Sequence, residues 1–236
     1  MKPARIALAL SVIAAIVLLV AGPGTRLDAW HFGIGLQMLR WAAYLGLAGA
    51  AVAIVLLLIP SQRRASTGAL LLAAVLGVAV AAVPWMFMRQ VKSVPPIHDI
   101  TTDTQRPPEF LAVLPLRKDA TNPVAYGGAE IAQQQQAAYP DLQPLRLEAP
   151  PAAAFDRALQ AARSMGWEIV AADPATGRIE ATDTTFWFGF KDDVVIRVEA
   201  DGAGSRIDVR SLSRVGGSDV GANAKRIRAY LDTLGG

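Results

Sequence analysis

The stretch WAAYLGLAGAAVAIVLLLI, from Trp41 to Ile59, carries no charged residue. Its nineteen helical residues would extend about 28 Å, close to the roughly 30 Å hydrocarbon core of a bilayer. Trp41 and Tyr44 are aromatic residues of the kind found at membrane interfaces, and the neighbouring Arg40 can reach lipid headgroups. The stretch therefore predicts a transmembrane helix.

Two further apolar segments lie on either side of this one. The segment from Gly68 to Met88 is also uncharged, and the short connection that begins with residues 60–64 joins it to Trp41–Ile59 as a helical hairpin. The segment from Ile6 to Ala21 is either a short span or the core of a signal peptide, and we favour an uncleaved span. The sequence thus predicts three N-terminal transmembrane helices, at about residues 6–21, 41–59 and 68–88.

The positive charge of the chain belongs to this membrane region. Residues 1–92 contain 8 Lys and Arg against one acid, a net charge of +7, whereas residues 93–236 contain 15 against 19, a net charge of −4, which together give the +3 of the chain. The water-facing part is therefore mildly acidic, which argues against a nucleic-acid partner. The chain has no cysteine, so disulfides and thiolate chemistry are excluded.

The basic residues also bear on orientation. The positive-inside rule compares the number of Lys and Arg residues on the two sides of the membrane, and here the two numbers are nearly equal. We give more weight to the compact Arg63-Arg64 pair, which predicts a cytoplasmic N-terminus and a periplasmic C-terminal domain on a plasma (inner) membrane. One side carries Lys2, Arg5, Arg63 and Arg64, and the other side carries Arg26, Arg40, Arg89 and Lys92.

The rest of the chain divides at Pro150. Residues 93–150 read as a Pro-rich linker and irregular wrapping segment, with one short helix at AEIAQQQQAAYP. Residues 151–236 follow the order helix, four strands, helix, which predicts an α+β core with an antiparallel sheet of about four strands and helices on one face.

The last two strands form a predicted hairpin, 191–200 with 205–214, across the turn Asp201-Gly202-Ala203-Gly204. Apolar and polar residues alternate along both strands, so one face is expected to be buried and the other to face water. The expected inward residues are Val194, Ile196, Val198, Ile207 and Val209, and the expected outward residues of the last strand are Arg206, Asp208 and Arg210.

Three motifs resemble a known family. They are PPIHDITTDTQRPPEF (95–110), GRIEATDTTFWFGFKDDVVIRV (177–198) and DVRSLSRVGGSDVGANAKRIRAYL (208–231). Together they resemble the bacterial domain-of-unknown-function family 1499, whose members often carry hydrophobic N-terminal helices. The resemblance covers roughly 95–231 and implies a domain with no assigned activity.

A glycine-rich turn at 215–223 is the first candidate site. Such a turn before a helix can offer free backbone N–H groups to an anion. In the alternative reading it is only a connection, and Ser218 or Asp219 caps the helix and takes the same donors. The candidate ligand- or anion-binding residues are Arg210, Arg214, Gly216, Gly217, Ser218 and Lys225.

An aromatic run, TFWFGFK at 185–191, is the second candidate. Four rings in five residues are more than one face of a strand can bury. They form a ligand lid, a partner surface, a contact with the lipid interface, or core packing beside Trp167. The candidate contact surface is Phe186, Trp187, Phe188 and Phe190.

A third candidate combines His98 with acids such as Asp183. One histidine among scattered acids is weak evidence for a metal or acid–base site, and no catalytic or dinucleotide motif appears. We expect no metal and no cofactor. The preferred hypothesis is a non-enzymatic envelope protein whose domain binds a protein or lipid partner. The alternative is a small-ligand-binding or enzymatic domain using His98, Asp183 and the turn 215–223.

Overall fold

The computed structural model describes residues 3–235 and divides into two compact units. The first unit holds the residues up to Gln90 together with Phe186–Gly189. The second unit holds Val91–Thr185 and Phe190 to the C-terminus.

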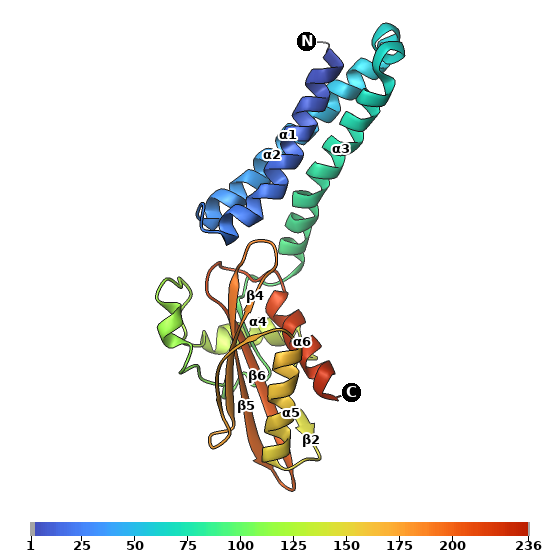
Figure 1. Cartoon of the computed structure of the whole chain (residues 1–236). Helices are drawn as coiled ribbons and strands as arrows, with labels where there is room; N and C mark the ends of the chain where they lie inside the picture. The colour runs from blue at the N-terminus through green and yellow to red at the C-terminus, as the bar shows by residue number, and fades with distance from the viewer. Residues whose placement is uncertain (1–2, 236) are drawn as a thin grey trace. The chain divides into compact units, whose positions relative to one another are not determined.

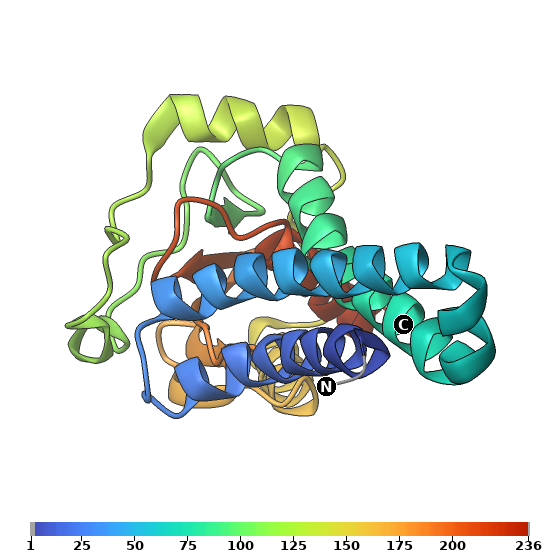
Figure 2. The same ribbon diagram turned by 90° about the horizontal axis from the view of Figure 1, so that it is seen from above.

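Three long helices make up most of the first unit. They are long and apolar enough to cross a membrane, as predicted, although their ends extend beyond the uncharged segments. The third helix is broken near its start, where Ser66 has non-helical angles (φ −152°, ψ 25°). The helices are α1 (Pro3–Arg26), α2 (Phe32–Leu58) and α3 (Pro60–Ser93), and Figure 2 shows α2 turning directly into α3.

Small residues bring these helices close together. A Cβ placed on Gly77 of α3 would lie 2.3 Å from the carbonyl oxygen of Gly46 on α2, so no larger residue fits there without movement. The buried Ser11 hydroxyl of α1 donates to the Ala73 carbonyl of α3 at 2.8 Å. Close backbone approach and a hydroxyl bond are the usual means of helix association in lipid.

An antiparallel sheet forms the centre of the second unit. Its order is β1-β6-β5-β4-β3, and β2 also pairs with β6. The sheet is thus larger than the predicted four strands, because β1 and β2 come from the segment 93–150 that was expected to be irregular. Three-residue strands are too short to show alternation. The strands are β1 (Asp99–Thr101), β2 (Leu145–Leu147), β3 (Glu168–Asp173), β4 (Arg178–Thr184), β5 (Lys191–Asp201) and β6 (Gly204–Ser213).

Two helices, α5 (Pro151–Ser164) and α6 (Ala222–Gly235), cover one face of this sheet, as predicted (Figure 1). α5 gives way to β3 at Gly166, whose positive φ of 76° is the left-handed conformation typical of a residue just after a helix. The unit also contains a 3₁₀ turn, η1 (Leu114–Arg117), and the predicted short helix, α4 (Gly128–Ala138).

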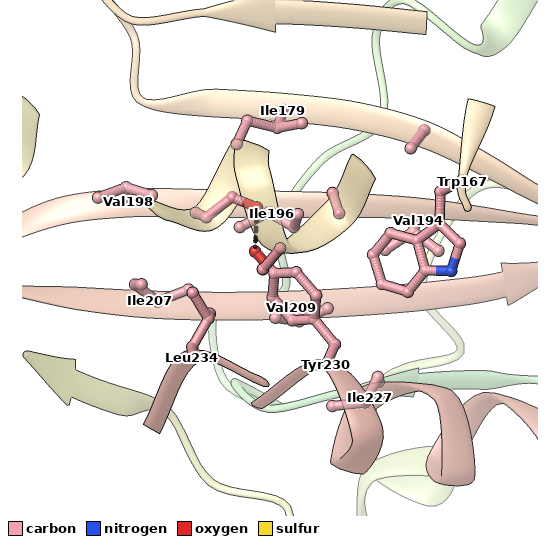
Figure 3. Close-up of a cluster of buried hydrophobic side chains, with 14 of the residues drawn as sticks. Trp167, Ile179, Val194, Ile196, Val198, Ile207, Val209, Ile227, Tyr230 and Leu234 are labelled. Carbon is pink, nitrogen blue, oxygen red and sulfur yellow. Dashed lines mark hydrogen bonds between the residues drawn. The ribbon is translucent and has the colours of Figure 1, made fainter. Parts of the chain in front are cut away.

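The main hydrophobic core lies between the helices and the sheet (Figure 3). Trp167 stacks on Tyr230 of α6 with 5.1 Å between ring centroids. The Tyr230 hydroxyl donates to the Ala158 carbonyl of α5 at 2.9 Å, so the ring joins both helices without leaving its polar atom unpaired. The strands contribute the aliphatic residues expected to face inward: Val194, Ile196, Val198, Ile207 and Val209.

The second face of the sheet is largely covered, contrary to the prediction from alternation. Asp208 is fully buried and Arg210 is only 3% exposed. The preceding segment folds over this face, where Phe110 and Val113 pack with Val195 of β5 in a second small cluster. The charges remain buried because they pair with one another, and the spacing along one strand cannot reveal such partners.

The outer edge of β1 is covered by a side chain of α4. The Gln135 amide accepts from the Thr101 N–H at 2.9 Å and donates to the Thr101 carbonyl at 2.6 Å. These are the two bonds that a neighbouring strand would make, so the amide satisfies an otherwise open sheet edge.

Candidate functional site

Arg210 lies at the centre of the buried charged face. Its Nε and Nη2 atoms donate to the two carboxylate oxygens of Asp99 at 2.9 and 2.8 Å. Its other hydrogen bonds go to backbone carbonyls, from Nη1 to Pro108 at 3.1 Å and from Nη2 to Val124 at 2.7 Å. The predicted anion-binding role of Arg210 thus falls on a side chain that already joins β1, β6 and the covering segment.

Two aromatic rings flank this guanidinium. The Arg210 Cζ atom lies 5.0 Å from the ring centroid of Phe110 and 5.5 Å from that of Tyr126. Burial, with a contribution from the Asp99 charge, raises the pKa of the Tyr126 hydroxyl to about 12, although Arg210 opposes the shift. The hydroxyl therefore keeps its proton at neutral pH. These side chains border a hollow of about 280 Å³.

Arg214, a second predicted anion-binding residue, is held by Asp193. Its Nη2 and Nε atoms donate to the two carboxylate oxygens at 2.8 and 3.0 Å. Arg117 of η1 donates to the same carboxylate at 2.5 Å, and the Thr182 hydroxyl at 2.8 Å. Asp193 is fully buried, so this cluster ties η1 to the adjoining ends of β5 and β6.

The glycine-rich turn is organised by its own acid. Asp219 accepts from the N–H groups of Gly221 at 2.8 Å and of Asn223, in the first turn of α6, at 2.9 Å. Gly216 and Gly221 have positive φ angles of 92° and 81°, which explains glycine at both positions. An external anion at this turn would compete with the Asp219 carboxylate for these donors.

Arg226 of α6 connects the parts of the third candidate. It donates to Asp183 at 2.7 Å and to Asp192 at 2.6 Å, and it also bonds Asn223. The Asn223 amide donates to the His98 backbone carbonyl at 2.9 Å. The structure therefore links the His98 backbone, Asp183 and the start of α6 through Asn223, the last residue of the turn 215–223, and Arg226.

The His98 ring itself faces the glycine-rich turn. Its Nδ1 atom lies 3.5 Å from the Gly217 carbonyl oxygen, at the limit of a hydrogen bond. Between residues 3 and 235, no group of three or more His, Cys, Asp or Glu side chains is placed to hold a metal ion.

The model of DUF1499, a protein family of unknown function, matches residues 99–234, more than half of the chain. The chain belongs to the DUF1499 family. The match begins at the first residue of β1 and ends in α6, so it takes in the whole sheet. No curated protein matches the chain.

The aromatic run of the DUF1499 domain forms the loop between β4 and β5. Its base is closed by two bonds, from the Thr185 N–H to the Phe190 carbonyl and from the Phe190 N–H to the Thr185 hydroxyl, both at 2.8 Å. Phe186 at the tip is 92% exposed.

Trp187 and Phe188 behave differently from Phe186. The two rings meet edge to face, with 5.2 Å between centroids. Within the first unit, the Trp187 indole lies against Gly22 and the Phe188 ring against Gly35. Trp167 stacks on Tyr230 instead, so these rings are not part of the main core of the sheet.

The DUF1499 domain also exposes leucines that the sequence analysis did not single out. Leu114 and Leu116 belong to η1 and are 43% and 51% exposed, and the nearby Leu111 is 47% exposed. Arg214, just after β6, donates to the Leu116 carbonyl at 2.9 Å, which fixes η1 near that end of β6. The run LAVLPL (111–116) carries three leucines, but their exposure depends on the tertiary fold.

Proposed function

We propose that this chain is a multi-pass membrane protein of the bacterial envelope whose DUF1499 domain lies outside the cytoplasm and binds lipid at the bilayer interface. Three helices of spanning length and composition support the membrane anchor. The Arg63-Arg64 pair, in the first turns of α3 before its break at Ser66, supports the orientation, because short cytoplasmic connections between spans are enriched in basic residues.

The observation that carries the lipid-binding proposal is the location of the exposed apolar side chains. Within residues 94–235, the large apolar side chains that are exposed are Leu111, Leu114, Leu116 and Phe186. Leucine and phenylalanine are the residues that amphipathic surfaces insert at the headgroup boundary.

Phe186 and η1 belong to the same end of the sheet. Phe186 lies two residues after Thr184, the last residue of β4, and η1 is bonded to Arg214 just after β6. The chain also enters the sheet at this end, because the His98 carbonyl, just before β1, accepts from the N–H of Ser213, the last residue of β6, at 3.0 Å. Five residues separate Ser93 of α3 from β1. A segment following so directly on a spanning helix stays near the bilayer, since five residues reach at most about 18 Å.

Photo-cross-linking distinguishes a lipid from a protein partner. Benzoylphenylalanine at Phe186 or Leu114, in the full chain in native membranes, should yield adducts whose added mass is that of a phospholipid. Ala203, exposed in the β5–β6 turn at the other end of the sheet, is the matched control and should yield none. Adducts with a protein alone, or equal lipid labelling at Ala203, would refute lipid binding.

A second candidate function is small-ligand binding beside the glycine-rich turn, using His98, Asp183 and the turn 215–223. One observation favours it: Asn223 and Arg226 bring these segments together, and Lys225 beside them is exposed. Titration of the full chain with inorganic phosphate should then shift the His98 ring resonances, and Lys225→Gln should weaken the effect. Resonances that do not move at millimolar phosphate would remove this candidate.

A further inference from the structure

A cleft on the DUF1499 domain has a lining unlike the charged network beside it. The cleft is about 640 Å³ in volume and lies between the segment Thr104–Pro107 and helix α4. None of its lining residues is Lys, Arg, His, Asp or Glu. A neutral lining disfavours phosphate, lipid headgroups and nucleic acid, because these ligands are recognised through cationic side chains.

The walls of this cleft carry uncommitted amides. Gln105 and Gln133 are both exposed and line it, and across residues 3–235 neither side chain makes a hydrogen bond. Their neighbours differ: Gln135 is bonded to β1, and Gln136 donates to the Thr104 hydroxyl at 2.9 Å. Each free amide offers two donors and an acceptor, which suits neighbouring hydroxyl groups that both donate and accept.

Small residues and one fixed ring complete the cleft. Gly128, Ala129 and Ala132 line it and leave the α4 backbone accessible to a bulky ligand. Tyr126 lines both this cleft and the smaller hollow beside Arg210, where the guanidinium lies 5.5 Å from its ring centroid. The ring is thus held in place before any ligand arrives, which lowers the entropic cost of binding.

We propose that this cleft binds a neutral oligosaccharide, with Gln105 and Gln133 bonding to hydroxyl groups and Tyr126 packing against the apolar face of a sugar ring. A peptide fits less well, since peptide recognition relies on pockets for alternate side chains and this lining offers only small residues between its amides. The inference stands apart from lipid binding, because none of the four exposed apolar side chains lines the cleft.

The test is a titration of the full chain in phospholipid nanodiscs, which avoids sugar-headed detergents. The probes are maltotetraose, cellotetraose and chitotetraose, followed by calorimetry and by saturation-transfer NMR. At least one probe should bind saturably, and Gln133→Ala should weaken it by about tenfold, the effect of losing one or two hydrogen bonds. Gln160→Ala, which replaces an exposed glutamine on α5, should leave the affinity unchanged.

Several results would overturn the proposal. They are the absence of saturable binding by all three tetrasaccharides, equal affinity in Gln133→Ala, and saturable binding of tetra-alanine at the same site. Tyr126→Ala also removes a ring beside Arg210 and is therefore secondary. Gln133→Ala is decisive because its side chain is exposed and makes no bond within the described chain, so the variant keeps the fold.

Discussion

Arg210 and Asp99, 111 residues apart in the chain, form a two-point ion pair in which Nε and Nη2 lie 2.9 and 2.8 Å from the two carboxylate oxygens. Both side chains are less than a tenth exposed. The pair joins neighbouring strands β1 and β6 on the face away from α5 and α6. Removing one member leaves a buried charge without its partner, which gives the pair a measurable role in stability.

We expect Arg210→Met to lower the free energy of unfolding by about 3–5 kcal/mol, the cost of an uncompensated buried carboxylate. The double variant with Asp99→Leu should regain most of this loss, since both charges are then absent. Pulse proteolysis in urea, with the full chain in nanodiscs, provides the measurement. Lys225→Met, at an exposed position, is the control. A double variant as unstable as Arg210→Met would contradict the assignment.

Two neighbouring glutamines of α4, Gln134 and Gln135, are expected to differ in their contribution to stability. Gln135 is 1% exposed and bonds both backbone groups of Thr101. Gln135→Ala should therefore cost about 1–3 kcal/mol, the penalty for leaving buried backbone groups unpaired. Gln134→Ala should cost far less, because Gln134 makes no such bonds. Hydrogen exchange at the Thr101 amide should speed up in the first variant alone, and equal exchange in both would contradict the edge-covering role.

Asp103 is the site at which we expect a pH effect. Burial raises its pKa, but the Arg106 N–H and the Arg206 charge outweigh burial and hold the pKa below its ordinary 3.8. A lowered folded-state pKa means that the carboxylate stabilises the fold above pH 3.8 and that this contribution is lost as the pH falls through the folded-state pKa.

The stabilities of the wild type and of Asp103→Asn are expected to become equal as the pH falls. Asp103→Asn should be less stable than the wild type at pH 7, and the difference should shrink as the pH falls below 3.8. Asp156→Asn, on the exposed side of α5, serves as the control. A difference that stays constant down to pH 2 would show that the Asp103 charge does not stabilise the fold.

The sequence predicts the parts of this fold whose signals are local. The β5–β6 hairpin, the helix α5 ending before Gly166 and the three apolar helices each carry their own periodicity, and all are present. The strands β1 and β2 were missed because three residues cannot show alternation. The expectation of a solvated second face failed because Arg210 and Asp208 look like surface residues until the covering segment is placed.

The candidate sites show the same limit. Arg210 and Arg214 are candidates because they are charged and near a glycine-rich turn, and Asp183 because it is an acid that could act with His98. Each has an ion-pair partner far away in the sequence. Residue types are visible in a sequence, whereas long-range pairing is not. The cleft lined by Gln105 and Gln133 belongs to two segments that look like an ordinary linker.

The absence of cysteine makes the proposed orientation directly measurable. Ala203→Cys in the β5–β6 turn should react with a membrane-impermeant maleimide added to intact spheroplasts. Gln62→Cys, in the first turn of α3, should react only after the membrane is opened. The reverse pattern would place the domain in the cytoplasm.

The proposal of lipid contact at the α3 end of the sheet is tested most directly by the environment of residue 186. A nitroxide on Phe186→Cys, in the full chain in phospholipid nanodiscs, should collide more often with oxygen than with a water-soluble nickel chelate, because oxygen concentrates in lipid. The same label on Ala203→Cys should show the opposite preference. The proposal would be contradicted if the ratio of oxygen to nickel collisions at position 186 matched that at position 203 and both were typical of a site in water.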